Sequence, residues 1–479
     1  MFKNIPVQFY FLLINRMREL LSLCLLVMLP VAGYGYDAKI DGIYYNLKST
    51  NHTATVTYRD QNYVSYAGEV VVPDSVEYNG ETYTVTAIGA YAFKACASLT
   101  AVSLPNSITN IYNHAFGSCS ALTEIVIPQN VKQIYDCTFE YCTSLTSITL
   151  PEGLTGIGSS AFEFCTSLQT IELPQGLTSI AASAFNKCQL LGEITIPDGV
   201  TNIEDRTFNG CSALRAVNLP KNLVGIGEGA FEECSLLTSV TLPASITIIG
   251  NGAFTSKALT VTVLGEDPAV LSNNAFDKST LFLVPDVDRY KAAWSGYDFI
   301  APLNGAAATV HLEAMSDKSA LQHTLGLDSL KKITSLTISG TINGYDIMMM
   351  RNQMPNLLDI DLRDARIVAN DYEYTQGYHS KQDTLTAYSF TGTGTHIRKA
   401  VLPNSVVWIE QNVFNTPYLR EIVLPENLLA IGDSTFYGYS ALHSVTLPET
   451  LTTIGKSAFQ GAGLTAVAIP ANVERIGEQ

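Results

Sequence analysis

Phenylalanine recurs at intervals of 23 residues through the first half of the chain. The same pattern of apolar, small and proline residues surrounds each one, so this part of the chain consists of copies of one unit. A unit of this length cannot bury its apolar side chains alone, and successive units must therefore stack on one another. The eight phenylalanines are Phe93, Phe116, Phe139, Phe162, Phe185, Phe208, Phe231 and Phe254.

Each unit contains a short segment that predicts a β-strand. In the first copy Val102, Ser103 and Leu104 alternate between apolar and polar, which is the period of a half-buried strand. Pro105 follows, and proline recurs at the same place in the next copies. Because proline has no N–H for a sheet, it marks the end of each strand. Stacking then aligns the strands of successive units into a parallel sheet.

The segment around each phenylalanine predicts a different conformation. Ala92, Phe93 and Cys96 are separated by three and four residues, which is the spacing of one helical turn. A Leu-x-x-Leu-x-Leu core with a period of about 20–29 residues is typical of leucine-rich repeats. We therefore predict an α/β solenoid with a parallel β-sheet on the concave face, short helical turns on the convex face, and a β-rich N-terminal cap.

The repeat pattern divides the chain into six segments. Residues 1–35 are predicted to be a signal peptide, 36–87 a β-rich cap, and 88–302 a first repeat array with a closing unit. Residues 309–368 are a variant leucine-rich-repeat segment, 369–389 an insertion loop, and 390–479 a second array. This second array stops in mid-repeat after Ile476, so we expect it to be truncated.

The first 35 residues have the layout of a secretory signal peptide. Lys3, Arg16 and Arg18 precede an apolar run over residues 20–31, and small residues follow it. A membrane anchor is disfavoured because the run is shorter than the roughly 20 residues that span a bilayer. Lipid attachment at Cys24 is disfavoured because no small residue precedes it. We expect a secreted or extracellular cell-surface protein with no membrane insertion beyond the signal peptide.

The charge balance argues against one class of partner. The 479 residues carry a formal net charge of −16, and only 15% of them are charged. Binding to nucleic acid needs a basic surface that neutralises phosphates, and so does binding to an anionic membrane. We therefore expect neither of these partners.

Seven of the nine cysteines occupy one position of the repeat, from Cys96 to Cys234. We predict that they lie side by side in the core as reduced thiols, because parallel side chains meet the disulfide torsion poorly. Cys137 lies outside this row and is the candidate for a disulfide, with Cys119 or Cys142 as its partner. No close ligand pair such as Cys-x-x-Cys is present, so we predict no metal site.

The alternation within each strand also predicts which side chains face outward. They are small, polar or weakly acidic, and we expect them to form a shallow binding face on the concave sheet. The tyrosine-rich loop is a second candidate, because loops and tyrosine are favoured at recognition surfaces; the alternative is a mobile spacer. The face candidates are Glu124, Thr149, Glu172, Glu193, Thr195, Asn218, Thr241, Lys399 and Glu421, and the loop candidates are Tyr372, Tyr374 and Tyr378.

No catalytic motif stands out in the sequence. The seven histidines do not pair at ligand spacing, and neither a Gly-x-Ser-x-Gly motif nor a glycine-rich phosphate loop is present. Isolated glutamates on an open sheet are usually only solvated. We therefore predict that the protein is not an enzyme and uses no cofactor.

The frame Ile-Gly-x-x-Ala-Phe-x-x-Cys-x-x-Leu-x-x-Val-x-Leu-Pro is clearest at residues 157–174, with Ile171 in the valine position. This frame resembles the BspA-like leucine-rich-repeat family, and the resemblance covers residues 88–260 and 397–476. It implies a bacterial secreted or surface protein that adheres to host matrix proteins such as fibronectin or mediates coaggregation of cells. It implies no catalytic residue.

Two functions follow as hypotheses. The first is a surface adhesion module that contacts a host matrix protein or a partner-cell protein through the solenoid. The alternative is a carbohydrate-binding or scaffolding component of a surface polysaccharide-handling complex. Glycan sites need an exposed aromatic platform, so exposure of Trp408 or of the loop tyrosines in a groove favours the second hypothesis.

Overall fold

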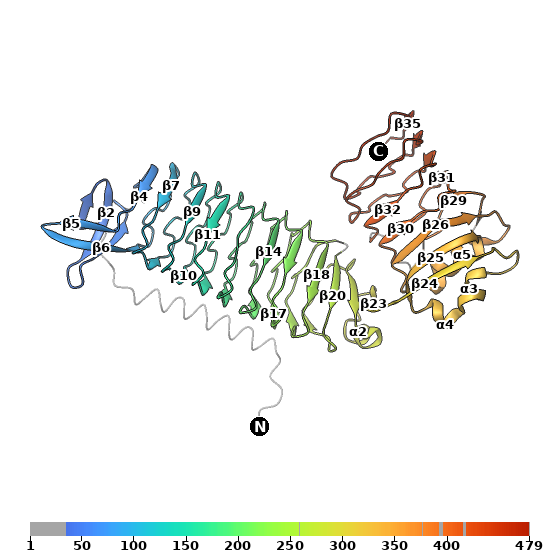
Figure 1. Ribbon diagram of the computed structural model, residues 1–479, viewed down its shortest axis with the longest axis horizontal. Coiled ribbons are helices and arrows are strands. Elements are labelled where there is room, and N and C mark those ends of the chain that lie inside the picture. Colours follow the sequence, from blue (N-terminus) through green and yellow to red (C-terminus); the bar gives the residue numbers. More distant parts are fainter. Residues whose placement is uncertain (1–34, 258, 376, 392–395, 415–417, 479) are drawn as a thin grey trace, which may run out of the picture.

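The computed structural model describes residues 35–257, 259–375, 377–391, 396–414 and 418–478. The predicted signal peptide, apart from Gly35, lies outside these residues. Two repeat arrays follow one another along the chain and meet where β23 (Ile300–Pro302) is followed by β24 (Ala306–Leu312) (Figure 1). Among the described residues, no helix is both long and apolar enough to cross a membrane.

The N-terminal cap is β-rich, as predicted. The pairs β1–β2, β2–β3 and β5–β6 are antiparallel hairpins. β3 and β4 pair in parallel with β6 and β7, so the cap continues both sheets of the solenoid. The strands are β1 (Ala38–Ile40), β2 (Ile43–Lys48), β3 (Thr53–Thr57), β4 (Gly68–Val71), β5 (Ser75–Tyr78), β6 (Glu81–Ile88) and β7 (Leu99–Ser103).

The coils of the first array are joined by two parallel hydrogen-bond ladders. The first ladder holds the strands that end at the repeated proline, and the pair Ile125–Ile148 shows its register. The second holds shorter strands, as in the pair Ile134–Ile157. The first ladder consists of four paired groups: β4–β7, β9 (Glu124–Val126) with β11 (Ser147–Thr149), β14 (Glu193–Thr195) with β16 (Ala216–Asn218), and β18 (Ser239–Leu242), β20 (Thr260–Val263), β22 (Leu281–Val284) and β23. The second consists of two paired groups: β8 (Asn110–Ile111), β10 (Gln133–Ile134), β12 (Gly156–Ile157) and β13 (Ser179–Ile180), which continue from β6, and then β15 (Asn202–Ile203), β17 (Gly225–Ile226), β19 (Ile248–Ile249) and β21 (Val270–Leu271).

The eight repeated phenylalanines form one continuous stack through the core. Each is fully buried, and the centroids of neighbouring rings lie 4.9–5.5 Å apart with the ring planes within 12° of parallel. Phe276 extends the stack, since its ring lies 5.1 Å from that of Phe254. The prediction that identical side chains of successive coils pack on one another is confirmed.

The segment that carries each phenylalanine is not a helical turn. In the first coil Tyr91 and Ala95 have left-handed backbone conformations, with φ of 61° and 57°. The N–H groups of Tyr91, Phe93 and Ala95 donate to carbonyls of the next coil. A left-handed residue cannot continue an α-helix. The prediction of helical turns on this side was therefore wrong, and tight turns tied from coil to coil take their place.

All eight cysteines among the described residues are free thiols. The seven in the repeat row are buried, and six of them donate a hydrogen bond of 3.0–3.3 Å to the carbonyl of the phenylalanine in the preceding coil. The structure therefore agrees with a row of reduced thiols. It contradicts a disulfide at Cys137, which is half-buried and unbonded to Cys119 or Cys142. Cys24 lies outside the described residues.

The predicted closing unit of the first array contains helix α2 (Val287–Ala293). Asp286 caps the helix by accepting a hydrogen bond from the N–H of Arg289. The hydroxyl of Tyr290 donates to the carbonyl of Gly265 at 2.8 Å, and the indole N–H of Trp294 donates to Ala269 at 3.0 Å. These bonds attach α2 to the last coils, and the helix covers the apolar side chains of those coils.

The variant segment and the second array share one core and one parallel sheet. Helices α3 (Ala320–Leu325), α4 (Leu327–Leu330) and α5 (Gly344–Gln353) lie beside this sheet (Figure 1). Gly326, with φ of 74°, separates α3 from α4. Asn343 and Asp346 form a capping box that starts α5. The sheet runs β24, β25 (Ile333–Ile342), β26 (Asp359–Ile367), β30 (Lys399–Val401) and β32 (Glu421–Val423).

The predicted insertion loop over residues 369–389 is shorter in the structure. β27 (Glu373–Thr375) and β28 (Tyr378–His379) form an antiparallel hairpin, but β29 (Thr384–Leu385) pairs in parallel with β31 (Trp408–Ile409). Leu385 and Phe390 are buried, and the ring of Phe390 stacks on that of Phe414 at 5.2 Å. The repeat coils therefore resume at β29, and their ladder continues through β31, β33 (Ala430–Ile431), β34 (Thr453–Ile454) and β35 (Arg475–Ile476).

The two arrays contact each other at an aromatic junction. The ring of Phe299 meets those of His396 and Tyr418 edge-on, each at 4.5 Å. The guanidinium of Arg420 donates a hydrogen bond to the carbonyl of Thr238 in the first array. Burial, followed by the charges of Asp277 and Asp298, raises the pKa of Tyr418. These contacts join the two arrays, which lie at an angle to each other in Figure 1.

Candidate binding surfaces

The outward side of the first ladder displays the predicted face residues; we call this surface the strand face. In β9, β11 and β14 the outer two residues are exposed and the middle one is buried, as the alternation requires. The register places Thr195 beside Asn218, and their side chains are hydrogen-bonded at 2.9 Å. The exposed candidates on this surface are Glu124, Thr149, Glu172, Glu193, Thr195, Asn218 and Thr241.

A hollow of about 800 Å³ on the strand face collects several of these residues. Three carboxylates line it, those of Glu152, Glu172 and Glu193, and no lysine or arginine does. Like charges gathered in one depression raise the local concentration of an oppositely charged group. The hollow therefore suits a basic side chain or segment. Its other predicted members are Thr149, Thr195 and Asn218, whereas Thr241 lines a separate hollow of about 340 Å³.

The two face candidates of the second array pair with each other. The ammonium of Lys399 lies 2.7 Å from the carboxylate of Glu421, on neighbouring strands of the shared sheet. Lys399 is half-buried and Glu421 is exposed. Because the charges compensate one another, this part of the sheet lacks the acidic character of the strand face.

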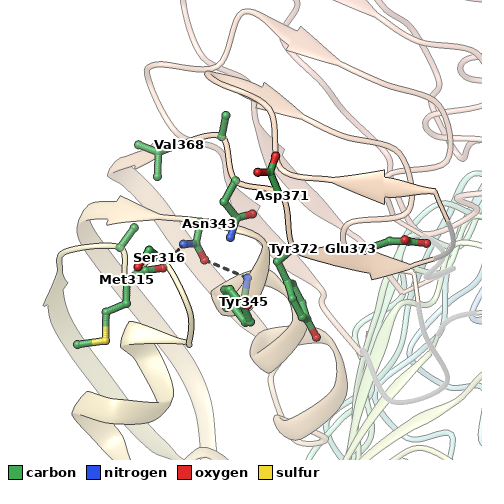
Figure 2. A pocket seen from close by; sticks show the side chains of 11 residues that line it. Met315, Ser316, Asn343, Tyr345, Val368, Asp371, Tyr372 and Glu373 are labelled. Carbon is green, nitrogen blue, oxygen red and sulfur yellow. Dashed lines mark hydrogen bonds between the residues drawn. The ribbon is translucent and has the colours of Figure 1, made fainter.

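The loop candidates separate into two places. Tyr372 stacks on Tyr345 of α5, with ring centroids 3.8 Å apart, beside a hollow of about 680 Å³ (Figure 2). Asn343 and Asp371 also line this hollow, and Asn343 accepts a hydrogen bond from the N–H of Tyr345. Sequence reasoning missed Tyr345, because only the fold brings α5 beside the loop. The side chain of Tyr374 lies outside the described residues.

Tyr378 lies on a different hollow, of about 710 Å³, together with Trp408. Trp408 is 53% exposed, although tryptophan is usually well buried. The carboxylate of Glu410, which lines the same hollow, is held by the ammonium of Lys381 at 2.6 Å and by the N–H of Ala387 at 2.9 Å. An exposed indole beside fixed polar groups is the arrangement that the glycan-binding hypothesis requires.

Comparisons with known proteins agree with the repeat architecture. The family model for the BspA type leucine rich repeat region matches in 6 copies, over residues 77–191, 155–282 and 378–479, which together exceed half of the chain. No curated protein matches the chain.

Several solved structures are similar to the chain. A leucine-rich repeat protein from Bacteroides ovatus is 24% identical, with a TM-score of 0.45, over 92% of this chain and 94% of that one. A leucine rich repeat protein from T. pallidum is 31% identical, with a TM-score of 0.37, over 42% of this chain and 90% of that one. A leucine rich cell surface protein from Faecalibacterium prausnitzii is 22% identical, with a TM-score of 0.37, over 92% and 94%.

The repeat frame, the stacked parallel coils and the matched family model lead to one assignment. This chain belongs to the BspA type leucine-rich repeat family, which is typical of bacterial surface proteins.

Proposed function

We propose that the protein is an exported adhesion module that binds a protein partner, either a host matrix protein or a surface protein of another cell, through the strand face. The acidic hollow of Glu152, Glu172 and Glu193 is the observation that carries this proposal. A basic segment of the partner occupies the hollow, and the exposed small side chains around it make close approach possible. Leucine-rich repeat families are typically binding scaffolds rather than enzymes, which supports a binding role.

The direct test is binding of the purified protein to immobilised matrix proteins, fibronectin first, and to whole bacterial cells. We expect binding that weakens as salt concentration rises, because exposed charges are screened beyond a Debye length of about 10 Å at 0.1 M. The double charge reversal Glu172→Lys with Glu193→Lys should reduce the affinity at least tenfold.

The matched control is Glu228→Lys, which changes the same charge on an exposed turn of the same array, away from the strand face. It should bind like the unaltered protein. Equal binding by the double variant and the control would contradict the strand face as the binding surface, and failure of the unaltered protein on every ligand would contradict adhesion.

The hollow at Trp408 supports a second candidate function, binding of a surface polysaccharide. Sugar rings stack on aromatic faces, and the neighbouring carboxylate and amide groups supply hydrogen bonds for hydroxyl groups. A glycan array tests this function. Trp408→Ala should abolish any glycan signal, whereas Tyr437→Ala, which removes a ring that is 57% exposed but lines no part of this hollow, should preserve it.

A glycan signal that survives Trp408→Ala would exclude this hollow as the glycan site. The two functions are separable, because the strand-face variants leave Trp408 untouched and the tryptophan variant leaves the acidic hollow untouched.

A further inference from the structure

The turns that precede the stacked phenylalanines of the first array carry a row of residues, here called the turn row, that has no role in the strand face. Tyr91, His114 and Cys137 occupy the same register on three successive coils, and all three have left-handed φ, of 61°, 55° and 54°. The N–H of His114 donates to the carbonyl of Asp136, which holds the second and third coils in register here. Side chains separated by 23 residues in the sequence are therefore neighbours in space.

Three metal-ligating side chains meet in this row. One ligand atom each from His114, Cys137 and Glu140 lie within 4.8 Å of one another. The Nδ1 atom of His114 is 3.6 Å from a carboxylate oxygen of Glu140, and both side chains are 26% exposed. Tetrahedral bonds of about 2.0–2.1 Å place nitrogen and oxygen ligands roughly 3.4 Å apart. The spacing is thus too long for a hydrogen bond and close to that of two ligands on one zinc ion.

The imidazole of His114 supplies an independent observation. Its Nδ1 atom is buried and has no hydrogen-bond partner among the described residues. The ring is fixed by stacking on Tyr91, with centroids 5.0 Å apart and planes 11° from parallel. A buried polar atom without a partner is costly, since it has lost its water and gained nothing in exchange. A cation between the three side chains would satisfy this atom.

The charges around the cluster also favour a cation. The carboxylates of Glu140, Asp136 and Glu163 all lie close enough to act electrostatically on the Cys137 side chain.

Among the described residues, the ammonium of Lys94 opposes these carboxylates, since it acts on both His114 and Glu140. Its ammonium lies over the ring of Tyr91, 4.9 Å from the centroid. The acidic groups outnumber it, so the local charge remains negative.

We propose that His114, Cys137 and Glu140 form a binding site for a thiophilic divalent cation, with Zn²⁺ as the best fit. One nitrogen, one sulfur and one oxygen ligand is a set that zinc accepts, whereas magnesium and calcium require oxygen ligands. Three protein ligands leave the fourth tetrahedral position open for water or for a side chain of a binding partner. The equivalent position in the next coil is Ser160, so the ligand set is not repeated there.

Cobalt titration is the direct test, because Co²⁺ occupies zinc sites and a thiolate ligand gives it a near-ultraviolet charge-transfer band. The purified protein, stripped with a chelator, should bind one Co²⁺, develop this band, and lose it when one equivalent of Zn²⁺ is added. Cys137→Ser should abolish the band. His114→Gln and Glu140→Gln should each weaken binding at least tenfold.

Glu232→Gln is the matched control, because Glu232 has the position of Glu140 in a coil whose turn row carries no cysteine or histidine. It should leave cobalt binding unchanged. A second measurement covers variants that fail to fold: alkylation of the unaltered protein, read by mass spectrometry, should show Cys137 protected by Zn²⁺. A band that persists in Cys137→Ser, or alkylation of Cys137 at the same rate with and without Zn²⁺, overturns the proposal.

Discussion

The thiol of Cys119 donates a hydrogen bond to the backbone carbonyl of Phe93 in the preceding coil, with 3.0 Å between sulfur and oxygen. The next five cysteines of the repeat row make the same bond to the phenylalanine 26 residues earlier. Each thiol is thus at once a small buried side chain and a donor between coils. This double role explains why the row is cysteine rather than alanine, and why its members do not pair as disulfides.

The first prediction concerns thiol reactivity. In the native protein freed of metal, Cys137 should be the first of the described cysteines to be alkylated, because it alone is half-buried while the others are buried. Its rate should rise about tenfold per pH unit between pH 8 and 10, since only the thiolate reacts and its pKa is raised to about 12. Peptide mapping after timed alkylation measures this order. Alkylation of Cys165 before Cys137 would contradict the structure.

The second prediction concerns the phenylalanine stack. Phe162→Ala should lower the free energy of unfolding by about 3–5 kcal/mol, because it removes a fully buried ring between two others. Phe164→Ala is the control, since that ring is only half-buried and stacks on Tyr141 at the turn side. Urea denaturation should show a much smaller loss for the control. Equal losses would mean that the stack is not the main source of stability.

The third prediction concerns alkaline pH. Burial raises the pKa of Cys142 and Cys211 from 9.0 to about 12, and that of Tyr45 from 10.0 to about 12. A raised pKa in the folded state stabilises the protein fully below the unfolded value and loses this effect as pH passes the folded value. The free energy of unfolding should therefore be constant up to about pH 9 and fall between pH 9 and 12. Denaturation curves that do not change across this range would contradict the buried, protonated thiols.

The fourth prediction concerns the junction between the arrays. Phe299→Ala removes the ring that contacts both His396 and Tyr418, so the arrays should move more freely. Small-angle X-ray scattering should give a broader distribution of interatomic distances, and limited proteolysis should cut faster near residues 303–305, between β23 and β24. Tyr437→Ala, at an exposed ring, should change neither. Unchanged scattering by Phe299→Ala would show that other contacts fix the angle.

Much of the fold could be predicted from the sequence, because a repeat turns local patterns into long-range contacts. The interval between Phe93 and Phe116 specifies which rings stack, and the alternation at Glu124 and Val126 specifies which side chains face outward. The tight turns could not be predicted. Tyr91 and Ala95 adopt left-handed conformations although neither is glycine, and they do so because hydrogen bonds to the next coil stabilise them.

The candidate sites were predicted less completely. The strand-face residues followed from alternation alone, but their collection around Glu152 in one acidic hollow depends on the shape of the stacked coils. The start of the second array at β29 was missed, because polar residues flank this strand and obscure the repeat pattern. His114 and Cys137 come together only through the stacking of two coils, so a search for closely spaced ligands in the sequence could not find them.

A double-mutant cycle tests the stacking of coils most directly. Phe139 and Phe162 are adjacent in the stack, with ring centroids 5.5 Å apart, whereas Phe139 and Phe231 are separated by several coils. Each is replaced by leucine, singly and in pairs, and the free energies of unfolding are compared. We predict a coupling of about 0.5–1.5 kcal/mol for the adjacent pair and additivity within about 0.5 kcal/mol for the distant pair. Equal coupling in the two pairs, or none in either, would contradict the stacked solenoid.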